Sequence, residues 1–208
     1  PDLTITVADP HRAGDEMGYY PGATNLRIAD VVVLNKVDTA EEAQIAVVRE
    51  NIERVNPTAT VVEAASPRHV DNPQALAGKR ALVIEDGPTL THGGMKYGAG
   101  LVAAREHGAS EIVDPRPYAV GSIAETFEHY PDTGPVLPAM GYGEAQMRDL
   151  AATIEAVPCD VVVIGTPIDL RRVIDIHKPT VRVTYELEER TQPDLEAILL
   201  RFMDPAFE

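Results

Sequence analysis

The sequence has little positive charge, a single cysteine and no tryptophan. Lys and Arg together number 18 against 33 Asp and Glu, which gives a formal charge of −15 at pH 7. This balance argues against a general binder of nucleic acid or of anionic membranes, because both need a basic surface. The same charge is compatible with a small anionic ligand, which a few cationic side chains and backbone amides could hold. The lone Cys159 excludes an internal disulfide framework and a multi-cysteine metal site.

Long hydrophobic runs and a signal peptide are also absent. The longest apolar runs, residues 31–34 and 161–164, have the length of a strand and are too short to cross a bilayer. With the single cysteine, this predicts a cytoplasmic protein that binds no membrane. The 208 residues allow one large domain or two small ones. A strand-like run follows Pro1 almost at once, so we expect a piece of a longer chain.

Short β-branched runs alternate with amphipathic stretches, a pattern typical of βαβ units on a parallel sheet. Strands are predicted over 3–8, 30–35, 60–64, 81–85, 111–113, 160–165 and 180–185, with a short one near 136–137. Helices are predicted over 40–55, 143–156 and 193–202, the first with a capping box of Thr39 and Glu42. Residues 66–73 are polar and rich in proline, and we expect a linker between two α/β segments there.

The tetrapeptide Asn35-Lys36-Val37-Asp38 follows a predicted buried strand. A carboxylate at Asp38 fits the N1–H and amino donors of guanine, whereas adenine would leave it unpaired at a cost of about 1–3 kcal/mol. Asn35 would brace the loop and the Lys36 stem would lie along the base. Ala65 and Ser66 end the next strand and resemble the small loop whose backbone N–H meets guanine O6 in G proteins. The alternative is a structural turn, since strand ends often carry these residue types.

A base pocket needs a phosphate cradle, and the sequence contains no Gly-x4-Gly-Lys-Ser/Thr motif. Either that loop lies upstream of Pro1 in a longer protein, or the tetrapeptide is a false positive. A glycine-rich stretch does follow the predicted strand 81–85 and leads into a predicted helix. That geometry collects unpaired N–H groups around an anion. Hydroxyl, imidazole and ammonium donors in it suit phosphate oxygens, although the glycines also fit a flexible loop; the stretch includes Asp86, Thr89, Thr91, His92, Gly93, Gly94 and Lys96.

Acidic residues with nearby arginines follow three further strands. Asp9 is placed to help bind Mg²⁺ or to position a nucleophile, and Asp114 is placed for a metal or hydroxyl contact. Arg116 could hold a carboxylate or phosphate, or form a surface ion pair with Asp114. Asp169 and Arg171 are predicted at the same sheet edge. A zinc site is not expected, whereas Mg²⁺ bound through one carboxylate and substrate phosphates would leave little trace in a sequence.

Taken together, these motifs resemble the C-terminal half of a prokaryotic family labelled cyclic 2,3-diphosphoglycerate synthetase or P-loop GTPase-like protein. The strings that carry the resemblance are Asp9-Pro10-His11-Arg12, residues 19–22, Asn35 to Ala40, residues 85–100, residues 114–118 and residues 166–170. Relatives usually have Pro and His where this chain has Ala13 and Asp15. The resemblance implies an upstream half that carries the phosphate loop.

The predicted fold class is therefore α/β, with parallel sheets and flanking helices. Residues 1–70 are expected to be the C-terminal portion of a P-loop NTPase-like domain, and residues 71–208 a Rossmann-like domain for a substrate or phosphate. The resemblance implies nucleotide-dependent closure of a phosphoanhydride in 2,3-diphosphoglycerate, with ATP or GTP and Mg²⁺ as cofactors. A homo-oligomer is also compatible with this interpretation. The rival hypotheses are a regulatory or metallochaperone-like GTPase and a non-catalytic anion-binding domain.

The residues of this predicted enzyme fall into four groups. Asp86, His92, Lys96, Asp114 and Arg116 are assigned to catalysis, and Asn35, Lys36, Asp38, Ala65 and Ser66 to the nucleotide base. Thr89, Thr91, Gly93, Gly94, Asp169 and Arg171 are assigned to the small phosphorylated substrate, and Asp9 to the metal. Without a phosphate loop, the fragment alone is expected to be inactive.

Overall fold

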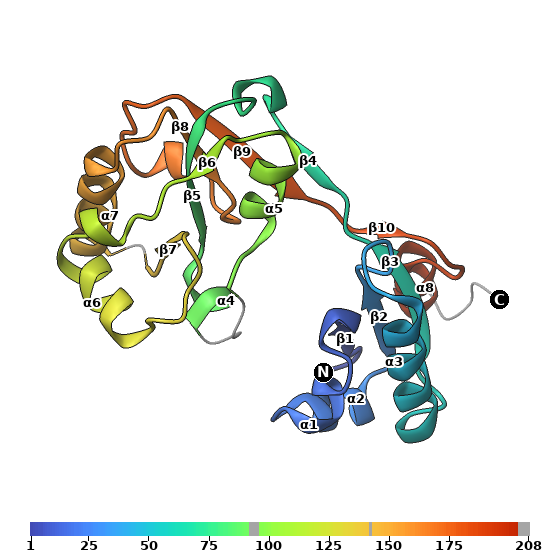
Figure 1. Ribbon diagram of the computed structural model, residues 1–208. Helices are drawn as coiled ribbons and strands as arrows, with labels where there is room; N and C mark the ends of the chain where they lie inside the picture. Colours follow the sequence, from blue (N-terminus) through green and yellow to red (C-terminus); the bar gives the residue numbers. More distant parts are fainter. Residues whose placement is uncertain (92–95, 142, 204–208) are drawn as a thin grey trace. The chain divides into compact units, whose positions relative to one another are not determined.

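The computed structural model describes residues 1–91, 96–141 and 143–203, and the chain folds as two compact units. The first unit contains Pro1–Pro67 together with the described part of Glu186–Glu208, and the second is Arg68–Tyr185 (Figure 1). The chain therefore passes from one unit to the other twice, after Pro67 and after Tyr185. The sequence predicted a boundary at residue 70 and assigned everything beyond it to the second domain, whereas the residues from Glu186 onward return to the first unit.

The first unit is built on a four-stranded sheet. Its order is β1 (Ile5–Ala8), β2 (Val31–Asn35), β3 (Thr60–Ala65) and β10 (Glu188–Glu189). The first three strands are parallel, with Val7 beside Val33 and Val33 beside Val62, and β10 is antiparallel to β3. The apolar run in β2 is buried along residues 31–34, as expected for a strand covered on both faces.

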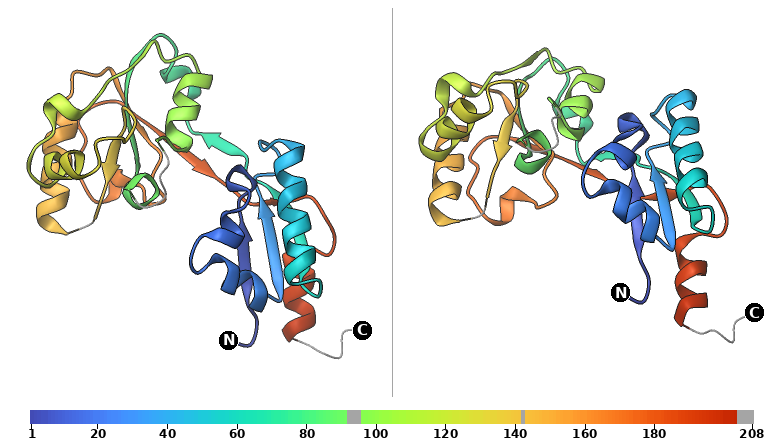
Figure 2. Two further views of the ribbon diagram at one scale, coloured as in Figure 1. Left: turned by 60° about the horizontal axis from the view of Figure 1, so that its bottom comes forward. Right: turned by 90° about the horizontal axis from the view of Figure 1, so that it is seen from below.

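Helices of the first unit are α1 (Asp15–Gly18), α2 (Gly22–Ile28), α3 (Glu42–Val55) and α8 (Leu195–Met203). The α3 helix packs Ile45, Val48 and Ile52 into the same cluster as Val32 and Leu34 of β2, and Figure 2 shows it lying along the sheet. The predicted capping box is wrong. Glu41 is the N-cap, and the Gln44 side chain accepts its N–H at 3.1 Å. Thr39 lies in the preceding loop, where its hydroxyl contacts His11.

The second unit has a larger sheet of order β4-β9-β8-β5-β6, with β7 also paired to β5. The strands are β4 (Arg68–Val70), β5 (Arg80–Asp86), β6 (Glu111–Ile112), β7 (Leu137–Ala139), β8 (Val161–Ile164) and β9 (Thr180–Tyr185). All pairs are parallel except β4 with β9. Because β4 falls within residues 66–73, the expected irregular linker is partly a strand.

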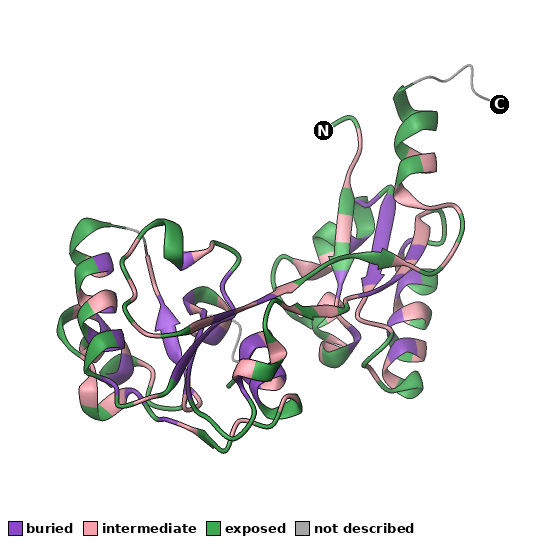
Figure 3. Ribbon diagram, turned by 90° about the horizontal axis from the view of Figure 1, so that it is seen from above, coloured by how far each residue is buried: buried purple, intermediate pink, exposed green. Residues whose placement is uncertain are grey.

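Helices cover both faces of this second sheet. They are α4 (Gly87–Thr91), α5 (Ala99–Glu106), α6 (Gly121–His129) and α7 (Glu144–Ala156). Alternate residues of β5 face opposite sides: Leu82 and Ile84 pack in one cluster with residues of α6 and α7, whereas Ala81 and Val83 pack in another with residues of α5. Figure 3 shows the resulting buried strands. The predicted α/β fold with mostly parallel sheets and flanking helices is confirmed.

Short 3₁₀ turns complete the two units, at Pro10–Arg12, Pro73–Ala75, Arg116–Tyr118 and Leu170–Arg172. Two of these turns contain arginines that the sequence assigned to a site, Arg116 and Arg171, and a third directly follows Asp9. Across residues 1–91, 96–141 and 143–203, every helix is too short or too polar to cross a membrane.

The buried centre of β5 gives a test of the fold. Ile84 is fully buried, whereas Ile168 is 41 % exposed in the same unit. We expect Ile84→Ala to lower the free energy of unfolding by about 2–5 kcal/mol, because it removes apolar contacts and leaves a cavity. Ile168→Ala is the matched control and should cost less than about 1 kcal/mol. Denaturant titration measures both, and equal losses would contradict the described packing.

Candidate functional site

The loop after β2 carries the predicted base-binding residues. The side-chain oxygen of Asn35 accepts the N–H of Lys36 at 2.9 Å, which braces the loop. Lys36 has a φ of 64°, a left-handed conformation that is uncommon for a residue with a side chain. Its ammonium lies 2.5 Å from the Oδ2 atom of Asp9. We call residues 35–38 the base loop.

The base loop lies beside the small-residue loop that follows β3. The N–H of Val37 donates to the carbonyl of Ala64 at 3.1 Å, and the N–H of Ser66 donates to Oδ1 of Asp38 at 3.1 Å. Ala65 is fully buried, whereas Asp38 is exposed. The Oδ2 atom of Asp38 makes none of the contacts described for this part of the chain, so it is open to a ligand. The structure therefore brings Asn35, Lys36, Asp38 and Ser66 together, and their role with a nucleotide stays a prediction.

Asp9, the predicted metal ligand, caps the 3₁₀ turn after β1. Its Oδ1 atom accepts the N–H of His11 at 3.0 Å, and its Oδ2 atom is paired with Lys36. Among the described residues, no group of three or more His, Cys, Asp or Glu side chains could hold a metal ion. A Mg²⁺ ion held mainly by ligand phosphates would not require such a group.

Two other acidic candidates repeat the geometry of Asp9. Asp114 accepts the N–H of Arg116 at 3.0 Å, and Asp169 accepts the N–H of Arg171 at 3.2 Å. In all three cases the aspartate side chain accepts the N–H two residues later, at the start of a 3₁₀ turn; Asp9 and Asp169 are the N-caps of their turns, whereas Asp114 precedes the N-cap Pro115. Such Asx turns are a structural use of aspartate. They account for these three positions without a ligand.

Both candidate arginines are already paired within the fold. Arg116 donates from Nη1 to Asp114 at 2.9 Å and from Nη2 to the carbonyl of Thr133, and its guanidinium lies 5.1 Å from the centre of the Phe127 ring. Arg171 donates to both oxygens of Asp169 at 2.9 Å. This pairing keeps the pKa of Asp169 below its ordinary value, mainly through the side-chain hydrogen bond. The ion pair left open as an alternative for Arg116 is present, and catalytic or binding roles for these residues stay predictions.

The end of β5 begins the glycine-rich stretch. The hydroxyl of Thr89 donates to Oδ2 of Asp86 at 2.9 Å, and the hydroxyl of Thr91 donates to the carbonyl of Gly87 at 3.0 Å. Lys96 is exposed. A side chain at Gly134 would collide with the Lys96 carbonyl oxygen, so Gly134 permits a close approach of two backbones. His92, Gly93 and Gly94 lie outside the described residues.

Glu85, for which the sequence predicted no site role, is the most unusual ionisable residue of this region. It is 2 % exposed, and its Oε1 atom accepts the N–H groups of Gly98 at 3.2 Å and Leu101 at 2.8 Å. A side chain at Gly98, Gly100 or Gly165 would press against its carboxylate. The start of α5, where the sequence predicted an external anion, is therefore occupied by the protein's own carboxylate. Glu85 directly follows the apolar run 81–84, and nothing in the local sequence distinguishes it from an exposed residue at the end of a strand.

Burial raises the pKa of Glu85 to about 7, against the opposing effect of the backbone hydrogen bonds. An acid whose pKa is higher in the folded state binds more protons there than in the unfolded chain. The stability that it contributes is therefore lost as the pH rises from 4.5, its ordinary pKa, to about 7. The loss amounts to about 3 kcal/mol by the conversion of a pKa shift into free energy.

Replacing Glu85 tests this linkage. Relative to Glu85→Gln, which cannot ionise, the unmodified protein should lose about 3 kcal/mol of unfolding free energy between pH 4.5 and pH 7. Denaturant titrations at several pH values provide the comparison. Glu128→Gln, at an exposed position on α6, is the control and should follow the unmodified protein at every pH. A constant difference between the unmodified protein and Glu85→Gln would contradict the raised pKa.

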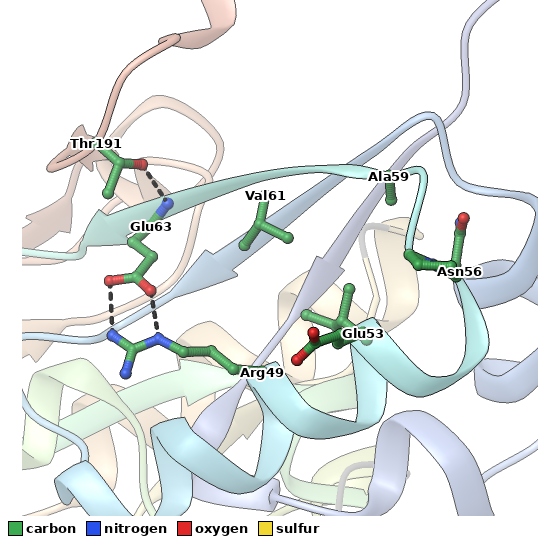
Figure 4. A pocket seen from close by; sticks show the side chains of 9 residues that line it. Arg49, Glu53, Asn56, Ala59, Val61, Glu63 and Thr191 are labelled. Carbon is green, nitrogen blue, oxygen red and sulfur yellow. Dashed lines mark hydrogen bonds and ion pairs between the residues drawn. The ribbon is translucent and has the colours of Figure 1, made fainter.

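A pocket of about 330 Å³ lies beside α3 in the first unit. Arg49 donates from Nε to Oε1 of Glu63 at 2.6 Å and from Nη2 to Oε2 at 3.0 Å, and the N–H of Glu63 donates to Thr191 (Figure 4). Pro57 and Ala59, which precede β3, also line it. The pocket therefore extends toward the amino-terminal end of β3, whereas the base loop lies at the carboxyl end of β2, at the opposite edge of the parallel strands.

Comparison with known proteins gives two findings. Residues 1–63 match the family model described as the CobW/HypB/UreG nucleotide-binding domain. Over 199 residues, or 96 % of this chain, the sequence is 61 % identical to a protein of Thermococcus kodakarensis named arginine synthetase ArcE. The chain spans 44 % of the length of that relative. The matched residues 1–63 include the base loop, so the first unit is similar to a nucleotide-binding domain at the place where the sequence predicted one.

Proposed function

We propose that this chain is part of a nucleotide-dependent synthetase that forms arginine. The observation that carries this proposal is the 61 % identity, over nearly the whole chain, to a protein named arginine synthetase. In the proposal, the first unit binds the nucleotide base and the second unit contributes to the site for the amino acid. A synthetase couples the formation of a bond to the cleavage of a nucleotide, so both kinds of site are needed.

The base loop supports recognition of guanine. The Ser66 N–H donates to Oδ1 of Asp38, which restrains the carboxylate, and Oδ2 makes none of the contacts described for this part of the chain. A carboxylate in a fixed orientation can accept from the N1–H and amino groups of guanine, and adenine offers no such pair of donors. GTP is therefore our proposed nucleotide, with ATP as the alternative that a direct comparison of the two nucleotides resolves.

Charge supports a cationic product over a highly anionic one. The chain carries a formal charge of −15. The two arginines predicted to hold phosphates, Arg116 and Arg171, are each paired with an aspartate. Two phosphate groups brought together would need unpaired cations to offset their repulsion. A guanidinium product needs carboxylate and carbonyl groups as hydrogen-bond acceptors, and this chain has more acidic than basic side chains.

Closure of a phosphoanhydride in 2,3-diphosphoglycerate is the second candidate. The motif strings favour it, above all the stretch from residue 85 to residue 100 that resembles the family with that label. Both candidates couple the formation of a bond to the cleavage of a nucleotide. They differ in the second substrate, so an assay that supplies each substrate in turn separates them.

Mg²⁺ would neutralise charge on the nucleotide phosphates in either reaction. The described side chains form no cluster for a metal. The sequence also lacks the Gly-x4-Gly-Lys-Ser/Thr motif. We therefore propose that this chain supplies recognition of the base and of the second substrate, and that a phosphate-binding loop comes from additional polypeptide.

The reverse reaction tests the function without knowledge of the precursor. The protein produced from the complete gene, given arginine, GDP or ADP, inorganic phosphate and Mg²⁺, should form the nucleoside triphosphate only when arginine is present. Chromatography of the nucleotides measures this. A second test replaces the homologous segment of the Thermococcus relative with this chain, and the chimera should form arginine.

The rival functions give different results in the same assay. A regulatory or metallochaperone-like GTPase would hydrolyse nucleotide without dependence on arginine or on 2,3-diphosphoglycerate. An anion-binding domain would bind ligands without nucleotide turnover. A cyclase would respond to 2,3-diphosphoglycerate alone. Any of these outcomes contradicts the proposed synthesis of arginine.

Substitution of Asp38 tests base recognition. An asparagine at this position offers an amide N–H where guanine also presents a donor, but it matches the carbonyl of xanthine. We expect Asp38→Asn to weaken GTP binding about ten- to a hundredfold and to improve binding of xanthosine triphosphate. Calorimetric titration measures both affinities, with Asp2→Asn at an exposed terminal position as the control. An unchanged preference would show that Asp38 does not contact the base.

A further inference from the structure

Two side-chain contacts join the loop after β1 to the loop after β2, which contains the base loop. The Nζ atom of Lys36 lies 2.5 Å from Oδ2 of Asp9, and Nε2 of His11 lies 3.0 Å from Oγ1 of Thr39. These four residues lie beyond the carboxyl ends of two neighbouring parallel strands, β1 and β2, and one of them, Lys36, belongs to the base loop.

The surroundings of Asp9 argue against a direct bond to a metal ion. One of its oxygens accepts the His11 N–H at 3.0 Å, and the other is in contact with an ammonium group. The side chains of Asp9 and Lys36 are 24 % and 36 % exposed, so the pair is partly shielded from water. A divalent cation bound to the same carboxylate would be repelled by the Lys36 charge at short range.

Different contacts hold the backbone and the side chain of Lys36. The left-handed backbone conformation costs free energy for any residue other than glycine, so neighbouring groups must stabilise it. The Asn35 side chain and the N–H groups of Thr39 and Ala40, which donate to the Lys36 carbonyl at 3.2 Å, hold the backbone. In the described part of the chain, Asp9 alone pairs with the ammonium. The direction of the Lys36 stem, which would form one wall of the base pocket, therefore depends on Asp9.

We propose that Asp9 is a positioning residue for base recognition: its carboxylate holds the Lys36 stem along the wall of the base pocket and does not ligate Mg²⁺. This inference rests on the proposed nucleotide binding by the first unit. It assigns to Asp9 a role through Lys36, with no direct contact to nucleotide or metal. It predicts that the effect of Asp9 is independent of Mg²⁺ and is expressed only when Lys36 is present.

A double-mutant cycle in the protein from the complete gene tests this role. Affinities for guanosine, and for a fluorescent GDP analogue with Mg²⁺ or with EDTA, are measured for Asp9→Asn, Lys36→Met and the double variant. We expect each single substitution to weaken guanosine binding about three- to fivefold, and the double variant to be no weaker than the weaker single variant. The Asp9→Asn loss should be the same with Mg²⁺ and with EDTA. Asp15→Asn removes an equal charge from an exposed position on α1 and should change nothing.

Each alternative outcome has a distinct meaning. A loss in Asp9→Asn that needs Mg²⁺ and spares guanosine would make Asp9 a metal ligand and overturn the proposal. Additive losses in the double variant would also overturn it. Unchanged guanosine affinity in Lys36→Met overturns it even if Asp9→Asn fails to fold. If the unmodified protein binds neither guanosine nor GDP, the proposed nucleotide binding itself fails, whereas binding that is equal in all variants removes only the role of Asp9.

Discussion

Burial of parallel strands on both faces is the constraint on which the rest of this structure depends. The strands β2, β5 and β8 carry apolar side chains in unbroken runs, because helices or other segments cover both of their faces. Polar residues therefore concentrate where the strands end. In the first unit this places the base loop beside Ser66, and in the second it places Glu85 and Asp86 at the start of the glycine-rich stretch. The candidate site residues of both units therefore lie at or just beyond the ends of buried strands.

Much of the fold was predictable because burial leaves a pattern in the sequence. The runs that became β2, β5 and β8 and the spacing that became α3 and α7 were identified near their observed positions. The strands β4 and β10 were missed, since they are short, antiparallel edge strands containing Arg68, His69, Glu188 and Glu189. Their pairing depends on distant partners and leaves no local apolar signal. For the same reason the return of the chain to the first unit was not foreseen.

Contacts between residues close in the sequence, or at the ends of adjacent parallel strands, were easier to predict than contacts that form only in the folded chain. The proximity of the loops after β2 and β3 follows from two adjacent parallel strands, and the sequence assigned both loops to one site. It assigned the backbone N–H of the Ala65-Ser66 loop to guanine, however, and did not predict that the Ser66 N–H donates to Asp38. The pairing of Arg116 with Asp114 and of Arg171 with Asp169 follows from Asx turns, and a repeated Asp-x-Arg spacing was its available signal. The setting of Glu85 could not be read locally, because glycines from α5 and from the end of β8 surround it only after folding.

The order of the strands along the chain has a consequence for biosynthesis. The β3 strand of the first unit is made early, but its antiparallel neighbour β10 is made only after all of Arg68–Tyr185. The edge of β3 that β10 covers thus has no partner from its own chain while the second unit emerges from the ribosome and folds. The sheet of the first unit can therefore be completed only after the last strand of the second unit has been made. Agents that shield unpaired strand edges, such as chaperones, would therefore act on the first unit of the nascent chain.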